Sequence, residues 1–316
     1  MNHAVHFGLT KCTARNIVGL ARGWEDRESM RLEHVDNGSL KASPRLMRMG
    51  LVGRGIQLSR TPAMHEAEAA AQGLRCSYEL LDTDTGIDDD LPAILDRVEA
   101  EGFSGLNITY PYKQAIISHL DGLSDAASRI GAVNTVVFRD GKRFGHNTDF
   151  WGFSESLRLG LPDAPMRCVL LMGAGGAGAA LAHALADIGV GRLLIADVRT
   201  DIAKALAQAT GAEAVDNPTR VIGAADGIVN ATPVGMASLP GTPIDPDLLE
   251  ARHWVADIVY FPLETVLIKA ARARGCRTLD GEGMAVYQAV RAFEHFTGHP
   301  ADAGRMRETF RRLGRI

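Results

Sequence analysis

Three glycines in the order G-x-G-x-x-G are the strongest chemical signal in the chain. Gly173, Gly175 and Gly178 follow the apolar residues 168–172 and open an alanine-rich segment. Glycine here lets the backbone approach a pyrophosphate, whose charge is favoured by the unpaired N–H groups at a helix start. The pattern predicts a dinucleotide site. The alternative is a glycine-rich turn in an α/β domain that binds no nucleotide.

An acidic residue stands where the next strand is expected to end. Asp197 lies about 20 residues beyond the glycines, the separation at which a carboxylate hydrogen-bonds the ribose diol of NAD. The same carboxylate would repel the 2′-phosphate of NADP. Arg199 could instead accept that phosphate, or it could simply lie in solvent. We therefore predict NAD as the cofactor, with NADP as the alternative.

Polar side chains recur on short loops that follow the expected strands. Ligands of open α/β sheets bind beyond the carboxyl ends of strands, so these side chains are expected to converge. Each also has a structural explanation, since Thr61 could cap a helix at Pro62 and Lys113 could lie in solvent. The candidates are Ser59, Thr61, Asn107, Thr109, Lys113, Asn134, Asn147 and Asp149.

Several other chemistries are excluded by the motifs. The segment at His65 lacks the second histidine of a zinc protease, and there is no G-x-S-x-G elbow or Walker lysine. The four cysteines are scattered, so we predict neither a disulfide framework nor a metal site. The net charge of −4 argues against nucleic acid. The uncharged residues 168–182 divide into a strand, a glycine loop and a helix start, so we expect no membrane span. Scattered cysteines are typical of reduced cytosolic thiols, so we expect a cytoplasmic protein.

Strand and helix signals alternate along most of the chain, which predicts a largely parallel sheet covered by helices. Expected strands are residues 50–56, 78–81, 105–108, 168–172, 192–196, 227–230 and 255–258, with a hairpin turn at Asp140–Gly141. Expected helices are residues 62–72, 91–101, 111–119, 150–159, 177–187, 202–209, 284–296 and 303–313.

These elements predict an α/β protein of two domains with a cleft between them. Residues 50–149, completed by helices from 284–316, would form a substrate-binding domain. Residues 150–283 would form a Rossmann-like, doubly wound dinucleotide-binding domain. Residues 1–49 lack a clear period and are expected to be a flexible extension, or to precede the true start.

Eight ordered motifs resemble those of the shikimate dehydrogenase family. They are GRGIQLSRTPAMHEA, GLNITYPYK, GAVNT, GHNTD, GAGGAG, NATPVGM, DIVYFPLET and GEGMAVYQAVRAFEHFTG, between about Gly50 and Gly298. Within the family the chain looks most similar to the NAD-preferring quinate/shikimate dehydrogenases. Those likewise carry Ser-x-Thr and an aspartate at the position of Asp197.

The resemblance implies a role for each matching residue. Lys113 and Asp149 would be the catalytic pair, and the substrate would be a cyclic polyhydroxy carboxylate. The implied substrate-binding residues are Ser59, Thr61, Asn107, Thr109, Asn134, Tyr260 and Gln288. The implied cofactor-binding residues are Gly173, Ala174, Gly175, Gly176, Ala177, Gly178, Asp197, Arg199, Asn230, Thr232, Val259, Gly283 and Met284.

The implied reaction interconverts quinate or shikimate with its 3-dehydro form by hydride transfer to NAD. Free lysine has a pKa of about 10.4, which burial would lower and a nearby Asp149 would raise, so the proton acceptor of the pair is left open. The alternatives are an NADP-dependent shikimate or aminoshikimate dehydrogenase, a carbon–nitrogen reductase, and a sensor without turnover. Biosynthetic or catabolic duty, and a monomer or a homodimer, are also left open.

Overall fold

The computed structural model of the protein describes residues 46–85 and 90–314. Of the extension predicted for residues 1–49, residues 1–45 lie outside this part of the chain. The first strand, β1 (Met47–Gly53), begins three residues before the predicted position, because Met49 is fully buried in the core and Met47 already pairs with Cys76. The predicted start of this strand is therefore corrected from residue 50 to Met47.

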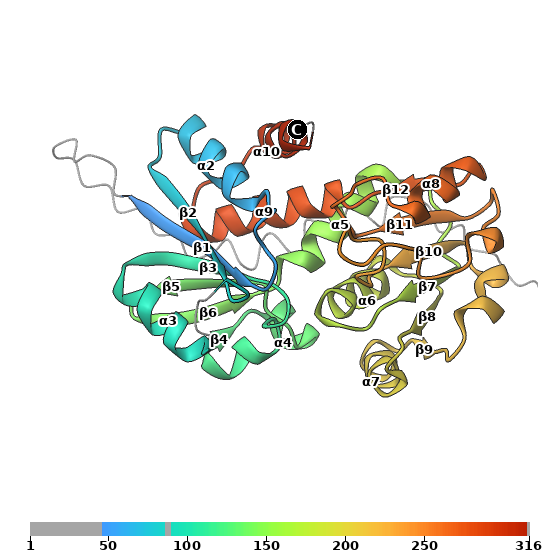
Figure 1. Cartoon of the computed structure of the whole chain (residues 1–316). Helices are drawn as coiled ribbons and strands as arrows, with labels where there is room; N and C mark the ends of the chain where they lie inside the picture. Colours follow the sequence, from blue (N-terminus) through green and yellow to red (C-terminus); the bar gives the residue numbers. More distant parts are fainter. Residues whose placement is uncertain (1–45, 86–89, 315–316) are drawn as a thin grey trace, which may run out of the picture. The chain divides into compact units, whose positions relative to one another are not determined.

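The first sheet contains six strands in the order β2-β1-β3-β5-β6-β4. Strands β1, β2 and β3 are parallel, whereas β5 runs antiparallel to both β3 and β6. Helix α3 covers one face and helix α9 the other (Figure 1). The further elements of this part are β2 (Cys76–Asp82), β3 (Phe103–Ile108), β4 (Gly122–Leu123), β5 (Thr135–Arg139), β6 (Lys142–His146), α2 (Thr61–Ala71), α3 (Leu91–Ala100), η1 (Ala115–His119) and α4 (Asp125–Ile130).

The second sheet is parallel throughout, in the order β12-β11-β10-β7-β8-β9. Strands β8 and β9 lie on one side of β7, and strands β10, β11 and β12 lie on the other. The boundary between β7 and β10 is therefore the switch point at which doubly wound sheets bind ligands. The predicted Rossmann-like order is confirmed. Its elements are β7 (Cys168–Met172), α6 (Gly176–Ile188), β8 (Arg192–Ala196), α7 (Thr200–Thr210), β9 (Glu213–Ala214), η2 (Pro218–Arg220), η3 (Ile222–Ala224), β10 (Gly227–Asn230), η4 (Pro246–Leu248), β11 (Trp254–Asp257), α8 (Val266–Ala273) and β12 (Arg277–Leu279).

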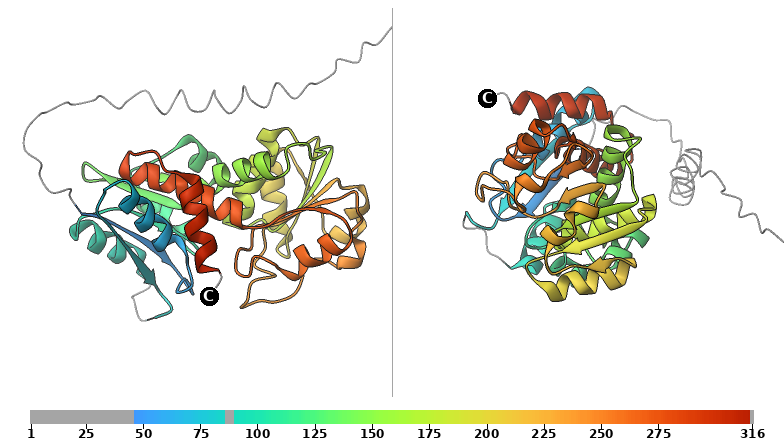
Figure 2. Two further views of the ribbon diagram at one scale, coloured as in Figure 1. Left: turned by 90° about the horizontal axis from the view of Figure 1, so that it is seen from above. Right: turned by 90° about the vertical axis from the view of Figure 1, so that its right-hand side faces the viewer.

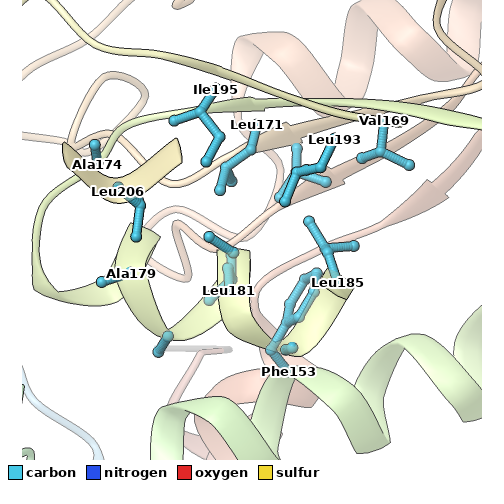
Figure 3. Close-up of a cluster of buried hydrophobic side chains, with 14 of the residues drawn as sticks. Phe153, Val169, Leu171, Ala174, Ala179, Leu181, Leu185, Leu193, Ile195 and Leu206 are labelled. Carbon is cyan, nitrogen blue, oxygen red and sulfur yellow. The ribbon is translucent and has the colours of Figure 1, made fainter. Parts of the chain in front are cut away.

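Both faces of the second sheet are buried, which explains the continuous apolar run of β7. Val169 and Leu171 pack with Leu181 and Leu185 of α6 on one face (Figure 3). Leu170 lies in a separate cluster on the opposite face, together with side chains of α8. Strand β7 is therefore held between two packed faces, and the glycine loop begins directly at its end.

Three helices complete the structure. Helix α5 (Thr148–Gly160) packs against α9 (Glu282–Thr297), and α10 (Ala303–Leu313) packs against both α2 and α9 (Figure 2). Helix α9 also contacts β3 and β5, so the end of the chain returns to the first sheet.

Two local predictions had different outcomes. The hairpin turn is confirmed, because Asp140 and Gly141 have positive φ of 54° and 67° between paired β5 and β6. The helix predicted from residue 111 is wrong in its first part. Residues 109–112 form a turn in which Tyr112 N donates to Thr109 O at 2.9 Å, and only the 3₁₀ helix η1 follows.

Within residues 46–85 and 90–314, no helix combines the length and the apolar character needed to cross a membrane. The same residues contain no group of three or more His, Cys, Asp or Glu side chains arranged to hold a metal ion.

Candidate active site

Lys113 and Asp149 form the central pair of the site. Lys113 precedes η1, and Asp149 lies in the first turn of α5, yet Lys113 Nζ is 2.5 Å from Asp149 Oδ2. Their side chains are only 18% and 7% exposed. A cationic donor thus lies beside a buried carboxylate acceptor, an arrangement that can hold or move a proton at a substrate hydroxyl.

The backbone around residues 132–133 positions both members of this pair. Asn147 caps α5 by accepting a hydrogen bond from Phe150 N at 3.1 Å, and its Nδ2 donates to Ala132 O at 2.9 Å. Val133 N donates to Lys113 O at 2.7 Å. One short segment therefore fixes the start of α5 and the turn that carries the lysine.

The lysine also lies against the glycine loop of the second sheet. A Cβ placed on Gly176 would be 3.3 Å from Lys113 Cβ and 3.4 Å from Lys113 Cδ. The predicted catalytic pair and the start of α6 are therefore neighbours, the arrangement that hydride transfer between a substrate and a dinucleotide requires.

Asn107 and Asn134 form a buried hydrogen-bonded network next to Asp149. Asn107 Nδ2 donates to Thr135 Oγ1 at 3.0 Å, and that hydroxyl lies 3.2 Å from Asn134 Oδ1. Asn134 Oδ1 also accepts from Thr148 N at 2.7 Å. The two asparagines are thus held in fixed orientations from β3 to α5, ending one residue before Asp149.

Tyr78 completes this network, although sequence reasoning gave it no role. Its hydroxyl donates to Asn107 Oδ1 at 2.7 Å, and the ring is 7% exposed. Burial raises the pKa of Tyr78 well above its ordinary value, so the phenol stays protonated and donates. A tyrosine in the middle of an apolar strand is the only signal, and it is indistinguishable from a core residue.

Replacing Tyr78 by phenylalanine should therefore weaken both stability and substrate binding. The change leaves Asn107 Oδ1 without its donor in a buried position, which costs about 1–3 kcal/mol of unfolding free energy. We expect KM for the substrate to rise several-fold while KM for the cofactor stays unchanged. Denaturant unfolding and steady-state kinetics measure both effects. Unchanged stability together with an unchanged substrate KM would show that Tyr78 does not hold Asn107.

Ser59 and Thr61 lie at the start of α2. Thr61 was considered as the helix cap, but the N-cap is Arg60, and Thr61 is the first helical residue. Arg60 O accepts the first helical bond from Met64 N, which leaves Thr61 one residue too late to cap. Ser59 Oγ instead accepts from Thr61 N at 3.3 Å. The Ser59 hydroxyl thus lies beside the backbone of Thr61, and no hydrogen bond within the described residues occupies the Thr61 hydroxyl.

The three remaining residues of the predicted substrate site, Thr109, Gln288 and Tyr260, lie on different elements. Thr109 has its methyl group over Gly53. Gln288 Nε2 donates to Ala285 O at 3.0 Å, within α9. Tyr260, 39% exposed, follows β11. Across the described residues, no hydrogen bond joins these three side chains to Lys113 or Asp149.

The three glycines of the G-x-G-x-x-G loop after β7 are required for different structural reasons. Gly173 has a φ of +98°, which favours glycine, and it packs on the backbone of Ala231. A Cβ on Gly178 would be 2.0 Å from Gly173 O, so a side chain there would separate the loop from α6. A Cβ on Gly175 would meet nothing within 4 Å. Gly175 is also the N-cap of α6 and has no side chain over the free N–H groups of the helix start.

Asp197 binds the loop itself. Its carboxylate accepts from Ala174 N at 2.7 Å and from Arg199 N at 2.8 Å, and the side chain is 9% exposed. The Arg199 side chain is 61% exposed, with Nε 3.8 Å from Asp197 Oδ1. The carboxylate is therefore fixed at the end of β8, beside the glycine loop.

A second buried network shapes the loops after β10 and β11. Asn230 Oδ1 accepts from Thr232 N and Oγ1 at 3.0 and 2.7 Å, while Asn230 Nδ2 donates to Asp257 Oδ1 at 2.9 Å. Asp257 also accepts from Val259 N at 3.0 Å. Burial raises the pKa of Asp257 above its ordinary range. Sequence reasoning missed Asp257, whose signal is an acidic residue at the end of an apolar strand.

Gly283, Met284 and Ala177 lie in the first turns of their helices. Gly283 packs against α5, since a Cβ there would be 2.0 Å from Ser156 Oγ. Met284 is 8% exposed and joins the core beside α6. Ala177 is the second residue of α6. Ala177 follows β7, and Gly283 and Met284 follow β12, so all three come after the carboxyl end of a strand of the second sheet.

The chain is similar to known proteins over most of its length. Residues 51–136 match the model of the shikimate dehydrogenase substrate binding domain, and residues 281–309 match that of the shikimate 5′-dehydrogenase C-terminal domain. A protein of Corynebacterium efficiens named quinate/shikimate dehydrogenase (NAD⁺) is 52% identical over 274 residues, which are 83% of this chain and 96% of that protein.

A Streptomyces avermitilis protein named shikimate dehydrogenase (NADP⁺) is 51% identical over 269 residues, 82% of this chain and 92% of that protein. Among solved structures, quinate dehydrogenase from Corynebacterium glutamicum in complex with NAD has a TM-score of 0.78 and 50% identity. The match covers 84% of this chain and 99% of that one. Sequence and fold thus lead to the same group of proteins.

Proposed function

The chain belongs to the shikimate dehydrogenase family, and from this premise we propose that it oxidises quinate or shikimate at a ring hydroxyl, with NAD as the hydride acceptor. The observation that carries the proposal is the Lys113–Asp149 pair, packed against the start of α6 at Gly176. A sensor without turnover has no need of such a pair.

The residues after β7 fit a dinucleotide. The free N–H groups at the start of α6 and the open space at Gly175 suit a pyrophosphate, and Asp197 at the end of β8 suits the adenosine ribose. When bound, NAD supplies C4 of its nicotinamide as the hydride acceptor. Thr232, Val259 and Met284 would line the nicotinamide end, because their loops and helix start lie at the same edge of the sheet.

The chain's own residues would then act on the ring. Ser59 and Thr61 would donate hydrogen bonds to the carboxylate, while Asn107 and Asn134 would orient the ring hydroxyls. Lys113 and Asp149 would receive the proton that leaves the oxidised hydroxyl. Lysine is the donor to Asp149 in the resting pair, so it can also donate to an alkoxide that forms beside it.

Asp197 favours NAD over NADP in this proposal. Its carboxylate is held by two backbone N–H groups and cannot move away from a 2′-phosphate without breaking these bonds. Arg199 is the nearest group that could bind such a phosphate. A cytoplasmic location fits the free thiols of Cys76, Cys168 and Cys276, because reduced cysteines are typical of that compartment.

One set of four assays tests the proposed function. NAD and NADP are each combined with quinate and shikimate, and reduced cofactor is followed by absorbance. We expect reduction with NAD and at least one ring acid, and a higher kcat/KM for NAD than for NADP. A preference for NADP would support the alternative of an NADP-dependent shikimate dehydrogenase. No reduction in any combination would contradict the proposal.

Removing both hydroxyls of the first loop should weaken substrate binding. The Ser59→Ala/Thr61→Ala variant is expected to raise KM for the ring acid about tenfold or more with much less effect on kcat. Binding of a carboxylate remote from the reacting carbon is shared by ground and transition states. Initial rates at saturating NAD measure this split. An unchanged KM would assign the hydroxyls to helix initiation alone.

A further inference from the structure

Arg60, the residue between Ser59 and Thr61, reaches the C-terminal helix. It is 8% exposed, its Nη1 donates to Phe310 O at 3.2 Å, and its guanidinium carbon lies 4.4 Å from the centroid of the Phe310 ring. The carbonyl end of a helix carries partial negative charge, so the last turn of α10 is a favourable partner for this cation. Burial lowers the pKa of Arg60, which reflects the cost of taking the charge out of water.

Phe310 contacts a second loop of the proposed site. Its ring centroid lies 6.2 Å from that of Tyr260, with an interplanar angle of 60°. Phe310 itself is fully buried. One aromatic side chain of α10 therefore lies between the arginine of the first loop and the tyrosine that follows β11. Such planar contacts fix orientation as well as distance.

Helix α10 is itself fixed at both ends. Arg305 forms a bidentate pair with Glu68 of α2, at 2.9 and 2.7 Å, and the Glu68 side chain is fully buried. Arg311 forms a second bidentate pair with Glu282 at the start of α9, at 2.7 and 2.8 Å. Helix α10 is thus held against α2 and α9 (Figure 2). Phe310 is fixed with the helix, and the position of Arg60 follows from its contacts with Phe310.

We propose that Arg60 is a positioning residue for substrate binding: by anchoring its loop on Phe310 of α10, it sets where the Ser59 and Thr61 hydroxyls lie and so how the ring acid's carboxylate is bound. This inference rests on the proposed function of those two hydroxyls. Ser59 N donates to Ile56 O at 2.9 Å, which closes a turn just before Arg60, and Thr61 begins α2 directly after it, so one anchored side chain between them sets the positions of both neighbours. The planar guanidinium stacks and donates at once, which a lysine ammonium cannot do.

The test compares a charged and a neutral form of the substrate. Arg60→Met keeps the apolar stem but removes the charge and the donor. Arg312→Met, on the exposed side of the same helix, is the matched control. Quinate or shikimate, whichever the wild type oxidises faster, is assayed beside its methyl ester at saturating NAD, and kcat, KM and melting temperature are measured.

We expect Arg60→Met to raise KM for the acid about tenfold or more, while KM for the ester rises much less and kcat and KM for NAD stay nearly unchanged. Arg60→Lys should give an intermediate KM for the acid, and Phe310→Leu should raise it as well. If Arg60→Met is unstable, KM for the acid is measured in these two variants instead.

Two results would overturn the inference. An unchanged KM for the acid would show that the contact between Arg60 and Phe310 does not affect substrate binding. An equal rise in KM for the acid and the ester would show that the substitution disturbs the site as a whole and not carboxylate binding. Both are distinguishable from failure of the proposed function, in which the wild type itself would oxidise neither quinate nor shikimate.

Discussion

Lys113→Ala is expected to lower kcat for oxidation of the ring acid by at least about 100-fold, the lower end of the effect of a general acid/base group. The lysine contacts Asp149 directly and lies beside the start of α6, which is where we propose that the hydroxyl loses its proton. Alanine keeps the Cβ that packs near Gly176. The loss is therefore chemical, and KM for NAD should change little.

Steady-state kinetics at saturating NAD and ring acid measures this effect. Lys204→Ala is the matched control, because Lys204 is an exposed residue of α7 and carries the same charge. Asp149→Asn should also lower kcat, and the double variant should cost little more than the worse single variant, since residues that act as a unit are not additive. A near-normal kcat in Lys113→Ala would remove the lysine from the chemistry.

Gly175→Ala should raise KM for NAD at least about tenfold, which corresponds to ~1.4 kcal/mol of binding free energy. The added methyl group meets nothing in the protein, so the melting temperature of the free enzyme should not fall. It would occupy the space into which the pyrophosphate is proposed to fit, at the N-cap of α6. Affinity for NAD should thus be lost without loss of the fold.

Gly178→Ala provides the contrast. Its methyl group would be 2.0 Å from Gly173 O, so the backbone must shift and the melting temperature should fall. Thermal unfolding and KM for NAD, measured on both variants, separate the two roles. Unchanged KM for NAD in Gly175→Ala would place the pyrophosphate elsewhere.

The parallel sheet was the most predictable part of the molecule. Strands β7, β8 and β10 and helix α10 have the predicted bounds. The strands are short apolar runs buried on both faces, and glycine or charged residues end them abruptly. Helix α8 was missed, because it is only 8 residues long and its start depends on Thr265, which caps it by accepting from Ile268 N.

The residues of the candidate site that belong to sequence motifs could be predicted. The residues that position them through tertiary contacts could not. Lys113 and Asp149 are 36 residues apart and were paired only through the family resemblance. Tyr78, Asp257 and Arg60 act through side chains of other elements, and their local sequences contain no sign of those partners. Long-range hydrogen bonds of this kind have no periodicity along the chain, so pattern analysis cannot find them.

The central claim is hydride transfer from a ring carbon to NAD, and an isotope experiment tests it most directly. Quinate or shikimate carrying deuterium at carbon 3 is incubated with the protein and NAD, and the reduced cofactor is analysed by mass spectrometry and NMR. We predict that the deuterium is recovered at C4 of the reduced nicotinamide and that the Lys113→Ala variant forms this product at least about 100-fold more slowly. Reduced cofactor without deuterium, or no reduced cofactor at all, would contradict the claim.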